Sequence, residues 1–133
     1  MSSLTYSLLV MSAPLGHQAP YTAEQFCRAA IARGHRIFRV FFYHDGVYNA
    51  LSTAVPPQDA AQLPAGWREL RDQHDVALTV CIASALKKGV VDAGEAKRYE
   101  LDAVTLDSHF EIAGLGDWIE ATQVSDRILT FAR

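Results

Sequence analysis

Hydrophobic positions along the chain fall into short apolar runs, separated by longer segments with a helical pattern. The runs are bounded by glycine, proline or polar turn residues, which is typical of β-strands. The run 76–82 (VALTVCI) is apolar at nearly every position, as expected for a strand that is buried on both faces. The pattern predicts strands over residues 6–12, 36–43, 76–82, 109–114 and 126–131.

The segments between these runs predict helices. After the first run, apolar residues recur every three or four positions and form one helix face: Ala23, Phe26, Cys27, Ala30 and Ile31. Thr22 is expected to cap this helix, with Gln25 as its capping-box partner, and Gly34 is expected to end it. Further helices are expected over 65–74 with Trp67 and Leu70 facing inward, over 84–88 before Gly89, after the capping pair Asp92 and Glu95, and over 115–124.

This order of elements predicts an α/β fold. We expect a single domain over residues 1–133, with a mainly parallel five-stranded sheet and helices on both faces. Functional sites in such folds gather at the carboxyl ends of the strands. The loop 12–20, the first part of the connection 44–59 and Cys81 are therefore expected to meet at one edge of the sheet.

Composition and charge narrow the possible functions. The formal net charge is −3, which argues against a protein that binds nucleic acid on its own. No apolar stretch reaches the roughly 18 residues of a membrane span, and the first residues lack the basic region of a signal peptide. Two cysteines are too few for a disulfide framework, so we expect free thiols and a cytoplasmic location.

Motifs for nucleotides and metals are weak. No phosphate-binding loop is present, and the segment 114–119 (GLGDWI) has Ile119 where a third glycine would be needed, so a tight turn is the better interpretation. His17 and His44 lie in loops expected near Cys81 and could activate a thiol or bind zinc. A structural zinc site needs four ligands at closer spacing. No metal or cofactor is therefore expected, and solvated loop histidines are the simpler alternative.

The two cysteines occupy different environments. Cys27 lies on the apolar helix face and is expected to be a small core residue. Cys81 ends a central strand just before a helix, whose first N–H groups favour a thiolate. Lys87 and Lys88 add positive charge nearby. On these grounds alone, a core role and a reactive role for Cys81 both remain open.

Three segments together resemble the TusD/DsrE family of sulfur-relay proteins: 25–50 (QFCRAAIARGHRIFRVFFYHDGVYNA), 76–92 (VALTVCIASALKKGVVD) and 110–121 (FEIAGLGDWIEA). The resemblance implies a DsrE-like fold with flavodoxin-like layering and sulfurtransferase activity without a cofactor. It also implies that Cys81 accepts sulfane sulfur as a cysteine persulfide. His44 stands where family members vary, so the resemblance gives it no catalytic role, and it gives none to Cys27.

The resemblance also implies partners. It predicts a heterohexamer with TusB/DsrH-like and TusC/DsrF-like subunits, an upstream persulfide donor and a TusE/DsrC-like sulfur acceptor. The favoured pathway is 2-thiouridine synthesis in tRNA, with dissimilatory sulfur oxidation as the alternative; direct nucleic acid or membrane binding is not expected. A non-catalytic scaffold subunit and a small-ligand binder remain as other classes. Within 42–51, packing inside the domain is at least as well supported as an interface role for Phe42 and Tyr43, while Val47, Tyr48 and Leu51 are the better candidates for a protein interface.

Overall fold

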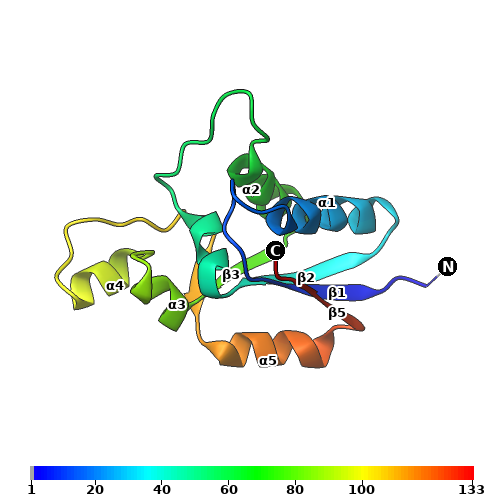
Figure 1. Cartoon of the computed structure of the whole chain (residues 1–133). Helices are drawn as coiled ribbons and strands as arrows, with labels where there is room; N and C mark the ends of the chain where they lie inside the picture. The colour runs from blue at the N-terminus through cyan, green and yellow to red at the C-terminus, as the bar shows by residue number, and fades with distance from the viewer. Residues whose placement is uncertain (1) are drawn as a thin grey trace.

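Strands that are connected through helices pair in parallel, because the chain returns to the same end of the sheet before each new strand begins. The computed structural model describes residues 2–133, and its strands form one five-stranded sheet in the order β4-β3-β2-β1-β5 (Figure 1). All neighbouring strands in it are parallel. The strands are β1 (Thr5–Val10), β2 (Arg36–Phe42), β3 (Ala77–Cys81), β4 (Glu111–Ala113) and β5 (Arg127–Phe131). The predicted fold class is confirmed.

Helices cover both faces of the sheet, as predicted. Helices α1 (Ala19–Ala32) and α2 (Leu63–His74) lie on one face, and α5 (Leu115–Val124) lies on the other (Figure 1). The short helices α3 (Ile82–Lys87) and α4 (Ala93–Arg98) follow β3 at the end of the sheet. The predicted N-cap role of Asp92 in α4 is confirmed, since the Glu95 N–H donates to Asp92 Oδ1 at 2.8 Å. No helix within residues 2–133 combines the length and apolar character needed to cross a bilayer.

The core lies between the sheet and the layer of α1 and α2. Leu8 of β1 and Cys27 of α1 are fully buried in the same cluster, as the helical spacing predicts. The Phe42 and Trp67 rings meet edge to face with centroids 5.2 Å apart, which joins β2 to α2. Trp67 and Leu70 are both fully buried, so the predicted inner face of α2 is confirmed.

Helix α1 begins earlier than its sequence predicts. Thr22 lies inside the helix, where its hydroxyl donates to the Gln18 carbonyl oxygen at 3.3 Å, so the expected capping box of Thr22 and Gln25 is wrong. Pro20 stands in the first turn, where its fixed φ suits the helix and its missing N–H leaves no bond unmade. The predicted end is confirmed, since Gly34 follows the last turn with a φ of +86°.

The segment after β2 folds back onto the sheet instead of forming an open loop. Residues His44–Ala50 form a 3₁₀ helix, η1, in which Val47 points into the core and is fully buried. The expectation that Val47 belongs to a protein interface is therefore wrong. Tyr48 and Leu51 are partly buried and also pack against the core. Phe42 is buried, as predicted.

Candidate functional site

Strand β3 carries Cys81 to the carboxyl edge of the sheet. Cys81 is the last residue of β3, pairs with Ala113 of β4, and is also the N-cap residue of α3. Its backbone is still extended, with φ −65° and ψ 123°, and the helix starts at Ile82. The rigid strand thus fixes the sulfur at a strand-to-helix turn, with free N–H groups of the first helical turn nearby.

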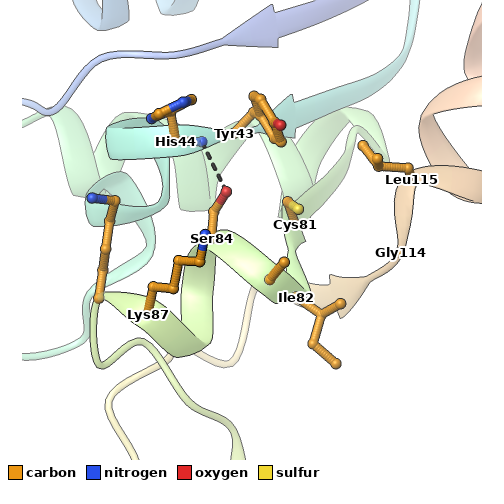
Figure 2. A pocket seen from close by; sticks show the side chains of 10 residues that line it. Tyr43, His44, Cys81, Ile82, Ser84, Lys87, Gly114 and Leu115 are labelled. Atoms are coloured by element: carbon orange, nitrogen blue, oxygen red, sulfur yellow. Dashed lines mark hydrogen bonds between the residues drawn. The ribbon is translucent and has the colours of Figure 1, made fainter.

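A pocket of about 350 Å³ opens beside Cys81 (Figure 2). Three chain segments line it, and each follows the carboxyl end of one of three neighbouring strands, β2, β3 and β4. This is the position expected for a functional site in a parallel sheet. The lining residues are Tyr43, His44, Cys81, Ile82, Ala83, Ser84, Lys87, Lys88, Gly114 and Leu115. Cys81 itself is 2% exposed and lines this pocket.

Ser84 joins two walls of the pocket. Its hydroxyl oxygen accepts a hydrogen bond from the His44 backbone N–H at 3.1 Å, shown as the dashed line in Figure 2. His44 has a φ of +53°, in the left-handed region that non-glycine residues rarely adopt. Such strain is tolerated only where the surroundings hold the backbone in place. The buried Ser84 side chain provides one such restraint.

The two lysines of the pocket have different electrostatic surroundings. Lys88 Nζ lies 2.8 Å from Asp45 Oδ1 and stands over the Tyr48 ring at 5.8 Å from its centroid. The hydrogen bond from Lys88 lowers the pKa of Asp45, and the same bond raises the pKa of Lys88. Lys87, the preceding residue, is exposed, and within residues 2–133 no carboxylate forms an ion pair with it. The positive charge expected near Cys81 is therefore present, but Asp45 neutralises half of it.

The structure brings together only part of the predicted site. His44 lines the pocket with Cys81, whereas His17 is exposed and outside its lining, which matches the alternative of a solvated histidine. The loop 12–20 does not reach the pocket; its Ser12 carbonyl instead accepts a hydrogen bond from the Asn49 side chain at 3.1 Å and so supports η1. Cys27 is fully buried in the core, and burial strongly raises the pKa of its thiol.

One wall of the pocket was missed in the sequence. Gly114 and Leu115 follow β4 and face Cys81 across the pocket. Gly114 forms the N-cap of α5, which confirms the tight turn inferred for the GLGDWI segment. The sequence carries only a partial cue: 109–114 is expected as a strand, but its place beside β3 follows from the strand order of the sheet. Within residues 2–133 no three His, Cys, Asp or Glu side chains form a group that could hold a metal ion.

Comparisons with known proteins agree with this geometry. The family model described as DsrE/DsrF-like matches residues 5–131. A protein of Allochromatium vinosum, provisionally named sulfurtransferase DsrE, is 43% identical over 128 residues, covering 96% of this chain and 98% of that protein. A sulfurtransferase TusD homolog of Vibrio vulnificus is 43% identical over 131 residues, covering 98% of this chain and all of that protein.

A solved structure supports the fold. The crystal structure of the YchN protein of E. coli superposes with a TM-score of 0.77 and covers 96% of this chain and 99% of the other. The sequence identity is 18%, so this likeness concerns the arrangement of the strands and helices alone.

Proposed function

Because this chain belongs to the DsrE/DsrF-like family, we propose that it is a sulfurtransferase in which Cys81 carries sulfane sulfur as a persulfide. The observation that carries the proposal is the position of the two thiols. Cys81 lines the pocket at the carboxyl edge of the sheet, and Cys27 is sealed in the core. Both relatives compared above carry the name sulfurtransferase.

The proposed chemistry is two successive thiol exchanges. The Cys81 thiolate attacks the outer sulfur of a donor persulfide; the S–S bond of the donor breaks, and the donor leaves as a thiolate. An acceptor thiolate then attacks the outer sulfur on Cys81, and the Cys81 thiolate is released. The sulfane sulfur is passed on without net oxidation or reduction, so no cofactor is required.

The family also supports a proposal about the setting of this reaction. The chain acts as one subunit of a heterohexamer with TusB/DsrH-like and TusC/DsrF-like subunits and passes sulfur from an upstream persulfide donor to a TusE/DsrC-like acceptor. The pathway is 2-thiouridine synthesis in tRNA, in the cytoplasm. Sulfur oxidation is the second candidate, because the DsrE and TusD relatives are equally similar at 43% identity.

The proposal is tested by intact mass after incubation with a persulfide donor. Wild type should gain steps of about 32 Da, one sulfur atom each, and Cys81→Ser should gain none. Cys27→Ala is the matched control; it removes a small buried side chain at a cost of about 1 kcal/mol and should be labelled like wild type. Equal labelling of Cys81→Ser and wild type would refute Cys81 as the carrier.

A further inference from the structure

The lining of the Cys81 pocket contains positively charged side chains but no negatively charged ones. Its ionisable members besides the thiol are Tyr43, His44, Lys87 and Lys88, and no aspartate or glutamate is among them. Lys88 is held by Asp45 at 2.8 Å, so its charge is largely compensated. Within the described part of the chain Lys87 has no such carboxylate partner. The pocket therefore contains one uncompensated fixed cation.

The geometry of α3 places this cation on the same side as the reactive thiol. Ser84 and Lys87 lie three residues apart in α3 and are neighbours on its surface, and both line the pocket together with Cys81, which immediately precedes the helix. In Figure 2 the Lys87 side chain runs back along α3 toward Ser84, on the pocket side of the helix. An ammonium group on the lining of the pocket is placed to contact an anionic molecule that enters it.

We propose that Lys87 binds an anionic group of the sulfane-sulfur donor, so that the pocket selects donors with a carboxylate close to the transferable sulfur. This inference rests on the proposed function and specifies its substrate class. A volume of about 350 Å³ is in the range of small-molecule sites, which suits a low-molecular-weight persulfide. A carboxylate presented by a protein or peptide has the same chemistry, and the donors compared in the test distinguish the two sources.

The charge of Lys87 also suits the transfer step. The Cys81 thiolate attacks the outer sulfur of R–S–SH, the S–S bond breaks, and the negative charge moves to the leaving R–S⁻. Lys87 transfers no proton in this step. Its fixed positive charge attracts the anionic donor and opposes the repulsion between this donor and the thiolate.

The test measures the rate of persulfide loading of Cys81 by intact mass in the full chain. The probes are glutathione persulfide, which carries carboxylates, cysteamine persulfide, which carries an ammonium and no carboxylate, and a persulfidated peptide with a free carboxyl terminus. The variants are Lys87→Gln, Lys87→Glu and, as the matched control, Lys97→Gln. Lys97 is an exposed lysine of α4 that lies outside the pocket lining.

With glutathione persulfide, Lys87→Gln should lower the second-order loading rate about fivefold to tenfold, and Lys87→Glu should lower it further. Lys97→Gln should stay within about twofold of wild type. With cysteamine persulfide, Lys87→Gln should load at least as fast as wild type, and added salt should shrink the difference seen with glutathione persulfide. If Lys87→Gln slows loading by the persulfidated peptide more than loading by glutathione persulfide, the carboxylate is assigned to a macromolecular donor.

Loss of charge at Lys87 without any change in the ratio of rates for the anionic and cationic donors would overturn this inference and leave the proposed function standing. A wild-type chain that no donor labels at Cys81 would contradict the proposed function itself, and the inference would fall with it.

Discussion

Gly46 is the position where a single added carbon conflicts most directly with the fold. A Cβ at this residue would lie 2.0 Å from the Val10 carbonyl oxygen, 2.9 Å from its carbonyl carbon and 3.4 Å from Met11 Cα. All three are backbone atoms at the end of β1, so no side-chain rotation relieves the clash. Ordinary contacts begin near 3.4 Å, and η1 must therefore move away from β1 by more than 1 Å in Gly46→Ala.

The cost follows from what this movement breaks. The Val10 carbonyl also accepts the Tyr43 N–H at 2.9 Å, and the Gly46 N–H donates to the Tyr43 carbonyl at 2.8 Å. Overpacking costs about 1–3 kcal/mol, and one weakened backbone hydrogen bond adds about 1 kcal/mol. We therefore expect Gly46→Ala to lower the free energy of unfolding by about 2–4 kcal/mol, or the melting temperature by roughly 8–16 °C.

Urea denaturation followed by circular dichroism measures this loss. The matched control is Gly94→Ala in α4, where an added Cβ meets only the Asp92 carboxylate at 3.6 Å, so the stability should change by less than about 1 kcal/mol. Because Tyr43 and His44 line the pocket, Gly46→Ala should also slow persulfide loading of Cys81 under conditions where it is folded. A Gly46→Ala chain as stable as wild type would show that the contact between η1 and β1 is described wrongly.

Two further predictions concern the pocket walls. Ser84→Ala removes the acceptor of the His44 N–H, so this amide should exchange with solvent faster and the stability should fall by about 1 kcal/mol; unchanged protection of the His44 amide in hydrogen exchange would contradict the restraint described above. The pKa of Asp45 is lowered by Lys88, so the Asp45 carboxylate stabilises the fold above its unfolded pKa and this contribution is lost as the pH falls through the folded pKa. Wild type should therefore lose more stability than Asp45→Asn when urea titrations are compared between about pH 6 and about pH 3; parallel losses in the two chains would exclude a stabilising ion pair with Lys88.

The layers of this fold could be predicted because they depend on local patterns. The apolar run 76–82 and the apolar helix face that contains Cys27 each indicate which residues are buried. The alternation of strands and helices is compatible with few fold topologies. The start of α1 was missed because Thr22 and Pro20 are both starting signals, and the rigid φ of proline decided between them. Pro20 is itself a signal for a first helical turn, but its place at the end of the loop 12–20 masks that signal.

The site was harder to predict because it depends on distant neighbours. Cys81 could be placed at a strand end from its own surroundings, but the fold of η1 depends on the close approach of Gly46 to β1, which no local pattern encodes. Val47 looked like a surface residue for the same reason. Likewise, Lys87 and Lys88 are adjacent in the sequence, and nothing around them indicates that only Lys88 forms an ion pair with Asp45.

The two side walls of the pocket have unequal support. On one side, η1 is anchored through the fully buried Val47 and Ala50. On the other, Gly114 and Leu115 continue from β4, an edge strand of three residues that has a neighbour on one side only. Short edge strands with few buried contacts open locally at a small free-energy cost. We expect the pocket to open mainly by displacement of the β4 side. An entering persulfide would then contact one mobile wall, formed by Gly114 and Leu115, and one rigid wall, formed by η1.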